Sequence, residues 1–186
     1  MSKSYSERVA RIRVPAGFFL GIVYVMFANP TSARLIWGSA IALVGLLLRA
    51  AGAGHLAKNQ RLARNGPYRF MRHPLYIGSA LAGIGFCVAG GQWWFFLLLG
   101  IFFAAVYWPV IRKEEAYLRR LFPEEYKRYR SIPFFALRPT SVLKTMSPQD
   151  RFSWQLYLKN REYQAFFAYL AIVLVLLSKM LLIAGT

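Results

Sequence analysis

The sequence is poor in acidic side chains and in the residues that build disulfides and metal sites. Its 186 residues include seven Asp and Glu against 24 Lys and Arg, two His and a single Cys. The lone Cys87 cannot form an intrachain disulfide, and we expect it to be a small core residue. The two histidines, His55 and His73, lack the partner ligands of a zinc site, so no metal is predicted.

Charged residues are missing altogether from the long stretch Pro74–Ile111. One transmembrane helix needs about 20 apolar residues, so this stretch is too long for one span and suits two. Gly90-Gly91-Gln92 near its middle supplies the turn between them. The whole chain is 57% hydrophobic, whereas soluble domains are about 45–50% apolar. The sequence therefore predicts a multi-pass integral membrane protein.

Three further apolar blocks bring the predicted number of spans to about five. They are Val14–Ala28, which is the shortest, Leu35–Leu48, which can continue through Ala53, and Tyr163–Ile183. The expected fold is an all-α polytopic membrane helical bundle. No internal repeat or second soluble domain is visible, so residues 1–186 are predicted to form a single integral membrane domain.

Basic residues gather on one predicted face of the membrane. Five spans with an inside N-terminus bring the clusters Lys3–Arg13, Arg49–Arg72 and Arg112–Arg161 together, and leave Arg34 and Lys179 towards the other side. The positive-inside rule then predicts a cytoplasmic N-terminus and an outside C-terminus. Near the outer end of the last span, Lys179 is expected to extend to water. Although the net charge is +17, no nucleic-acid recognition module is visible, so no nucleic-acid partner is expected.

The cytoplasmic segments carry signals for the ends of helices. Pro74 suits the first turn of the third span, where its missing N–H costs nothing, and it keeps His73 out of the helix. Pro123 is expected to restart a helix after the fourth span. Ser147-Pro148-Gln149-Asp150 has the cap, proline and acidic residue that begin a helix. We expect residues 140–186 to hold an interfacial helix and the last transmembrane helix.

Polar groups that suit a small zwitterion are predicted to meet where the third and fourth spans leave the membrane. Arg72 and His73, at a helix N-terminus, favour a carboxylate. Opposite them, Glu114 and Glu115 can take an ammonium group or hydroxyls. S-Adenosylmethionine is a zwitterion with a cationic centre of this kind. The structural alternative is that the four side chains pair with one another and bridge two helices.

The residues around this meeting point form an ordered series of short motifs. In chain order these are Gly54-His55-Leu56-Ala57-Lys58, Gly-Pro-Tyr at 66–68, Arg-His-Pro-Leu-Tyr-x-Gly at 72–78, Glu-Glu-x-x-Leu at 114–118 and Phe-x-x-x-Tyr-x-x-Tyr at 122–129. The series resembles the isoprenylcysteine carboxyl methyltransferase and phospholipid methyltransferase family of membrane enzymes, from about Arg49 to Pro139. The resemblance implies a methyltransferase core at 49–139 and a cytoplasmic site for S-adenosylmethionine.

The resemblance also implies roles for single residues. Residues matching cofactor contacts are Lys58, Gln60, Arg61, Leu62, Ala63, Tyr68, His73, Pro74, Leu75, Tyr76 and Glu114. Eukaryotic members have a substrate-contacting Arg four residues before the acidic cofactor ligand; here that position is Val110, with Arg112 nearby as the candidate substrate contact. We predict catalytic roles for Arg72, which can steer an anionic acceptor headgroup, and for Glu115, which faces Arg72 or the acceptor.

The predicted reaction is methyl transfer to a lipid-like or prenylated acceptor, as in isoprenylcysteine carboxyl O-methyltransferases. One alternative is N-methylation of a phospholipid amine, for which Glu115 or Glu114 would be the candidate base. A second is a membrane reductase of related architecture that uses NADPH, and a third is a non-catalytic membrane assembly protein. Expected partners are a membrane lipid or a lipid-linked acceptor.

Overall fold

The structure is a computed structural model that describes residues 17–58, 60–130 and 151–184. All elements within these ranges are helical, in agreement with the predicted all-α class. They are the N-terminal helix Gly17–Phe27, α2 Ser32–Ala53, the 3-10 turn η1 Gly66–Arg69, α3 Pro74–Gly90, α4 Trp94–Phe102, the π-turn η2 Phe103–Tyr107, α5 Trp108–Leu121, α6 Pro123–Tyr129, α7 Trp154–Lys159 and α8 Tyr163–Ala184.

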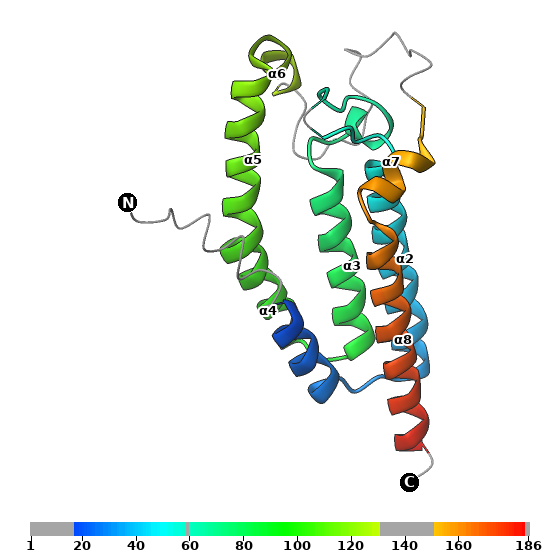
Figure 1. Ribbon diagram of the computed structural model, residues 1–186. Helices are drawn as coiled ribbons and strands as arrows, with labels where there is room; N and C mark the ends of the chain where they lie inside the picture. The colour runs from blue at the N-terminus through cyan, green and yellow to red at the C-terminus, as the bar shows by residue number, and fades with distance from the viewer. Residues whose placement is uncertain (1–16, 59, 131–150, 185–186) are drawn as a thin grey trace.

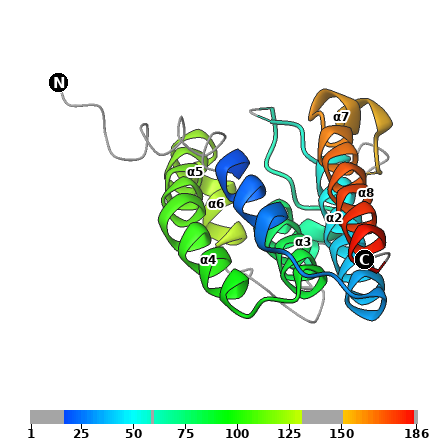
Figure 2. The same cartoon turned by 90° about the horizontal axis from the view of Figure 1, so that it is seen from below.

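The long helices form two groups. In Figure 1, α2, α3 and α8 stand side by side, and α4 with α5 forms a second arm that leans away from them. The view along the bundle in Figure 2 places the N-terminal helix between this arm and α3. The loop after α2, with α6 and α7, lies at one end of the bundle, and the turn between α3 and α4 lies at the other (Figure 1).

Within the described ranges, three helices are long and apolar enough to cross a membrane: Ser32–Ala53, Trp94–Leu121 and Tyr163–Ile183. The chain is thus an integral membrane protein. The N-terminal helix and α3 are apolar but shorter. With 17 residues, α3 is roughly 25 Å long, compared with about 30 Å for the hydrocarbon core of a bilayer. The five-span count therefore stays a prediction.

The predicted break between the third and fourth spans is confirmed. Helix α3 ends at Gly90, and Gly91 follows with φ of 73°. This left-handed conformation is one that glycine adopts without a steric penalty. Trp94 then begins α4. The chain reverses within a few residues, so α4 starts beside the end of α3.

Helices α2 and α3 approach each other with almost no side chains between them. A Cβ atom added at Gly45 would lie 2.5 Å from both the backbone N of Ala82 and the backbone O of Gly78. Small residues allow this backbone contact, which stabilises membrane helices through van der Waals packing. The approach continues to the end of α2, where Gly52 lies against Pro74. The loop that follows α2 is thereby placed beside the first turn of α3.

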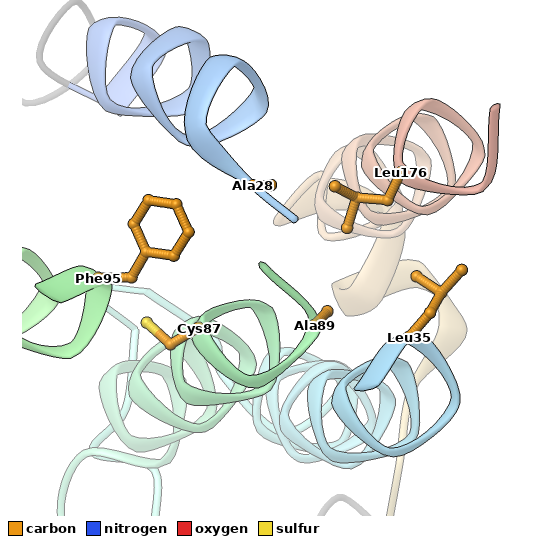
Figure 3. Packing of buried hydrophobic residues seen from close by; sticks show 6 residues of the cluster. All are labelled: Ala28, Leu35, Cys87, Ala89, Phe95 and Leu176. Carbon is orange, nitrogen blue, oxygen red and sulfur yellow. The ribbon is translucent and has the colours of Figure 1, made fainter. Parts of the chain in front are cut away.

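A buried apolar cluster joins the helices at the other end of the bundle. Its members come from the end of the N-terminal helix, α2, α3, α4 and α8: Ala28, Leu35, Cys87, Ala89, Phe95 and Leu176 (Figure 3). Leu176 is fully buried, and it brings α8 into this core. Cys87 is buried in the same cluster, which confirms its predicted role as a small core residue.

The second arm is one continuous helix with a wide turn inside it. Pro109 has no N–H to donate to the carbonyl four residues earlier, a defect that often widens or bends a helix. Here the N–H of Trp108 bonds to the carbonyl of Phe103, five residues earlier. The π-turn Phe103–Tyr107 thus accommodates the proline, and α5 continues to Leu121. As predicted, this helix runs on through Glu114 and beyond its apolar part.

Lys179 differs from its predicted role. Instead of simply extending to water, its ammonium group donates to the carbonyls of Val25 and Met26, at 2.9 and 2.8 Å. These carbonyls belong to the last turn of the N-terminal helix, where carbonyls lack intrahelical partners. The positive charge also complements the negative end of that helix. Lys179 therefore ties the N-terminal helix to α8.

The remaining helix starts agree with the sequence in part. Helix α6 begins at Pro123, as predicted. The predicted helix start at Ser147–Asp150 lies outside the described residues. The short helix α7 begins at Trp154, and the hydroxyl of Ser153 accepts a bond from the N–H of Leu156, so Ser153 is its N-cap.

Candidate active site

The first turn of α3 forms one wall of the candidate site. The helix begins at Pro74, and His73 precedes it with φ of −130° and ψ of 60°, outside helical geometry. This agrees with the prediction from the His-Pro pair. The His73 residue is only 4% exposed. An imidazole is thus held inside the protein at the N-terminal end of a helix, where N–H groups and the positive end of the helix dipole also point.

A cavity of about 190 Å³ lies at this end of the bundle. Its walls come from the loop after α2, from the segment that runs through η1 into α3, and from α5 with α6. The residues that line it are Leu56, Lys58, Arg61, Leu62, Ala63, Tyr68, Arg72, His73, Pro74, Leu75, Tyr76, Glu114, Tyr117, Leu118 and Tyr129.

This lining includes every residue that the family resemblance assigns to the cofactor, with the exception of Gln60. Gln60 is exposed and lies outside the cavity wall, although its neighbour Arg61 is part of it. Arg112, the candidate substrate contact, is exposed on α5 and also lies outside this wall. The loop, α3 and α5 thus bring together residues that are more than fifty positions apart in the sequence.

Glu114 joins α5 to α3 within the cavity. The hydroxyl of Tyr76 donates to its Oε2 at 2.7 Å. The Tyr76 ring also lies near the rings of His73 and Tyr107, with centroids 5.8 and 5.6 Å apart. A carboxylate accepts about four hydrogen bonds, so Glu114 keeps capacity for a ligand. The site therefore offers one negative group among aromatic faces, which is a good environment for a cation.

Glu115 points to a different part of the site. Its Oε1 accepts from Nη1 of Arg72 at 2.9 Å and lies 3.0 Å from Nε2 of His73. Consecutive helical residues diverge by about 100°, which explains why Glu114 lines the cavity and Glu115 does not. The structural alternative of a helix-bridging ion pair thus describes Glu115, whereas Glu114 bonds to a neutral tyrosine.

Arg72 contributes both to the cavity and to the ion pair with Glu115. Its side chain lines the cavity, and one of its guanidinium nitrogens bonds to Glu115. Its Nε is buried and has no hydrogen-bond acceptor within the described ranges. The Arg72 side chain as a whole is 18% exposed, so the part of it that faces the cavity is not this nitrogen. Arg72 thus contributes positive charge to the cavity wall.

Two buried tyrosines close the cavity on the side of α6. The hydroxyl of Tyr129 donates to the backbone carbonyl of Arg72 at 2.5 Å. Burial raises the pKa of Tyr129 above its usual value, and the Glu114 carboxylate adds to the rise. The pKa of Tyr68 is raised in the same direction, again chiefly by burial. Both side chains therefore stay neutral at ordinary pH and serve as hydrogen-bonding and packing groups.

The position of α6 was not foreseen from the sequence, but its apolar face was. Tyr126 and Tyr129 are buried with Leu62 of the loop after α2, and Leu118 and Phe122 pack against them. The three- and four-residue spacing of the Phe-x-x-x-Tyr-x-x-Tyr motif is what places these side chains on one face. The motif thus packs α6 against the loop after α2, and it adds Tyr129 to the cavity wall.

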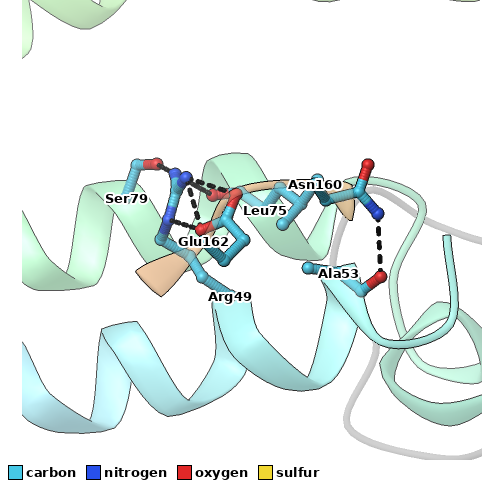
Figure 4. A network of polar contacts seen from close by, with 6 residues as sticks. All are labelled: Arg49, Ala53, Leu75, Ser79, Asn160 and Glu162. Carbon is cyan, nitrogen blue, oxygen red and sulfur yellow. Dashed lines mark hydrogen bonds and ion pairs between the residues drawn. The ribbon is translucent and has the colours of Figure 1, made fainter. Parts of the chain in front are cut away.

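A polar network outside the cavity ties three helices together (Figure 4). Arg49 of α2 forms a two-pronged ion pair with Glu162, which precedes α8: Nε to Oε2 is 3.0 Å and Nη2 to Oε1 is 2.8 Å. The third guanidinium nitrogen donates to the carbonyl of Leu75 at 3.3 Å and to the hydroxyl of Ser79. Nothing in the sequence predicted this pair, because its partners are 113 positions apart.

A model of the phospholipid methyltransferase family matches residues 19–125. Among curated proteins, the protein-S-isoprenylcysteine O-methyltransferase of Schizosaccharomyces pombe is 23% identical over 133 residues, which cover 69% of this chain and 56% of that protein. The cobalt-zinc-cadmium resistance protein CzcN of Cupriavidus metallidurans is 36% identical over 78 residues, covering 42% of this chain and 36% of the relative.

A third relative, the nickel-cobalt-cadmium resistance protein NccN of Alcaligenes xylosoxydans xylosoxydans, is 35% identical over 78 residues, or 42% of this chain and 37% of that protein. The matches thus span between about a third and just over half of the relatives' own lengths. No solved structure matches. In the part of the chain that the structure describes, no group of three or more His, Cys, Asp or Glu side chains could hold a metal ion.

Proposed function

Because this chain belongs to the phospholipid methyltransferase family, we propose that it is an enzyme that transfers a methyl group from S-adenosylmethionine to a lipid-like or prenylated acceptor. The acceptor chemistry we favour is that named for the Schizosaccharomyces pombe relative, O-methylation of an isoprenylcysteine carboxyl group. The observation that carries the proposal is the cavity at the start of α3, whose lining includes the assigned cofactor residues from Lys58 to Glu114 apart from Gln60.

The cavity suits the cofactor chemically. S-Adenosylmethionine has a carboxylate, an ammonium group, a sulfonium centre and an adenine ring. Glu114 complements a positive group, and Tyr76 beside it offers an aromatic face. The N-terminal end of α3 with His73 suits the carboxylate. Buried Leu62 and Ala63 provide apolar surface for the adenine ring.

The protein's own part in the reaction is positioning and exclusion of water. When bound, S-adenosylmethionine supplies a methyl group that is already activated on sulfur. The buried residues around Tyr68 and Tyr129 keep bulk water from one side of the cavity. Orienting two reactants in this way can supply a large share of the rate enhancement.

The acceptor is proposed to meet Arg72, which lies outside the run of residues assigned to the cofactor. The positive charge of its guanidinium group, which lines the cavity, would attract the acceptor's anionic headgroup and hold it at the cavity. A carboxylate acceptor, with a reference pKa of about 3.3–3.7, is already ionised at neutral pH and requires no general base. Glu115 then acts by orienting Arg72.

The second candidate is N-methylation of a phospholipid amine, which the name of the matching family favours. An amine acceptor must lose a proton before or during transfer. Glu114 lies in the cavity and is the better-placed base, whereas Glu115 is already engaged by Arg72 and His73.

The proposed placement in the membrane has five spans, with the N-terminus and the cofactor site in the cytoplasm and the C-terminus outside. It is supported by the side on which the cations fall and by the position of α6 and α7 at one end of the bundle (Figure 1), where residues of the loop after α2 and of the first turn of α3 line the cavity. We further propose one membrane domain over 1–186, with the methyltransferase core at 49–139.

The test is ligand binding by the purified protein in lipid nanodiscs. Calorimetry should show binding of S-adenosylmethionine and none of NADPH. His73→Ala and Tyr76→Ala should weaken binding by about tenfold or more, whereas Tyr163→Phe, at the start of α8, serves as a matched control. Mass spectrometry of lipid extracts incubated with labelled cofactor then identifies the acceptor.

The outcomes separate the alternatives. Binding and oxidation of NADPH would support a reductase, and binding of neither cofactor would support a non-catalytic assembly protein. Label on a prenylcysteine carboxyl group supports the favoured acceptor, and label on a phospholipid amine supports the second candidate. Unchanged cofactor affinity in both the His73 and Tyr76 variants would remove the cavity from the proposal.

A further inference from the structure

Residues on either side of α7 contact the C-terminal end of α2. Asn160 donates from Nδ2 to the carbonyl of Ala53 at 3.0 Å and to that of Leu56 at 2.9 Å. The N–H of Ser153 bonds to the carbonyl of Gly54 at 2.9 Å. The carbonyl of Ala53 also accepts from the N–H of Leu56 at 3.2 Å, and Asn160 adds to it a cap that comes from more than a hundred residues away.

The capped carbonyls lie where the chain leaves α2 for the cavity. Ala53 is the last residue of α2, and Leu56 is the first residue of the following loop that lines the cavity. The same loop continues through Lys58, Arg61, Leu62 and Ala63 in the cavity wall. The Asn160 amide therefore fixes the position of the loop that follows α2 at the point where this loop leaves the helix.

Glu162, two residues after Asn160, contributes to the opposite wall of the cavity, which is the first turn of α3. It holds Arg49, whose guanidinium also donates to the carbonyl of Leu75 in the first turn of α3. The side chains of Arg49 and Glu162 are 22% and 11% exposed, so the pair is largely shielded from water and salt. The segment 160–162 thus contacts two walls of the cavity: the loop after α2, through Asn160, and the first turn of α3, through Glu162 and Arg49.

We propose that Asn160 and Glu162 are positioning residues that hold the two walls of the cavity at the spacing which cofactor binding requires. The inference rests on the proposed function of this cavity. Both residues lie beyond the family match, which ends at residue 125. Asn160 and Glu162 would thus support the cavity from a part of the chain that the family model does not cover.

The experiment compares Asn160→Ala and Asn160→Asp with Tyr169→Phe. Asp has the same shape as Asn but no amide donor, so it removes both hydrogen bonds and little packing. Tyr169 also ties α8 to α2, through a 3.2 Å bond to the carbonyl of Ser39, but away from the cavity. The measurements are the thermal midpoint, the dissociation constant for S-adenosylmethionine, and turnover at saturating cofactor.

Both Asn160 variants should raise the dissociation constant about tenfold, and their turnover at saturating cofactor should stay near that of the unmodified protein. Tyr169→Phe should lower the thermal midpoint without changing the dissociation constant. Glu162→Gln should behave like the Asn160 variants. Wild-type affinity in all three site variants would overturn the proposal, and so would an equal loss of affinity in Tyr169→Phe.

A second measurement does not depend on the cofactor. Hydrogen exchange of the backbone amides at 55–63 should speed up in the Asn160 variants and not in Tyr169→Phe, since only the former lose the cap. Unchanged exchange in this loop refutes the positioning role even in a protein that binds no S-adenosylmethionine. If the unmodified protein binds no cofactor but the loop exchanges faster in the variants, it is the proposed function that fails.

Discussion

Replacing Glu114 by Gln changes one charge in the cavity and leaves its shape intact. The amide oxygen of Gln can still accept from Tyr76, which bonds to Oε2 of Glu114 at 2.7 Å. What is lost is the negative charge that would attract the positive part of the cofactor. Glu114→Gln should therefore weaken cofactor binding without loss of folded protein, and Tyr76→Phe should do so by removing the partner that orients the carboxylate.

The magnitude follows from the kind of interaction. A hydrogen bond to a charged group is worth about 1.5–3 kcal/mol. At about 1.4 kcal/mol for each factor of ten, the dissociation constant for S-adenosylmethionine should rise by roughly ten- to a hundredfold in Glu114→Gln. Turnover at saturating cofactor should change less, because the chemistry of a carboxylate acceptor does not use this group as a base.

The assay is a double-mutant cycle measured by calorimetry on wild type, Glu114→Gln, Tyr76→Phe and the double variant. Groups in contact show coupling energies of about 0.5–3 kcal/mol, so the two effects should not add. Single-turnover rates on the same preparations separate binding from chemistry. If Glu114→Gln binds the cofactor normally while Arg72→Ala does not, the roles that we assign to these residues must be exchanged.

Other predictions concern the acceptor, the orientation in the membrane and pH. Arg72→Ala should lower turnover about tenfold or more with little change in the affinity for S-adenosylmethionine, because Arg72 is assigned to the acceptor. A loss of cofactor affinity with unchanged turnover would contradict this. In a Cys87→Ala background, a cysteine at Gly66 should be labelled from the cytoplasm and one at Gly91 from outside, and labelling of position 91 only from the cytoplasm would overturn the five-span topology. The pKa of Tyr129 is raised in the folded state, so its contribution to stability is present below about pH 10 and is lost as the pH rises further; thermal unfolding should show a shallower alkaline loss in Tyr129→Phe.

Local signals in the sequence were sufficient for the helix ends that depend on proline and glycine. Pro74 fixes its own φ and Gly91 permits a positive φ, so the start of α3 and the turn after it could be predicted from local residues alone. The wide turn in the second arm was not predicted, although Pro109 was visible, because a proline can also kink or end a helix.

The candidate site was accessible from sequence because its residues form short motifs with recognisable order. Helical geometry indicated that Glu114 and Glu115 point in different directions, and Glu115 indeed contacts Arg72; the assignment of Glu114 to the cofactor rests on the family resemblance. The Arg49–Glu162 pair and the Asn160 cap could not be foreseen, since each depends on how distant helices pack. The close backbone contact at Gly45 has the same origin: only the fold reveals which glycines face another helix.

The bond between Lys179 and the carbonyls of Val25 and Met26 has a consequence for biogenesis. The two carbonyls belong to an early helix, whereas their partner lies more than 150 positions later in the chain. The carbonyls of Val25 and Met26 therefore gain the ammonium group only after α8 has been synthesised. A chain that stops before Lys179 should accordingly leave these two carbonyls without that partner, even though α2 to α5 are present.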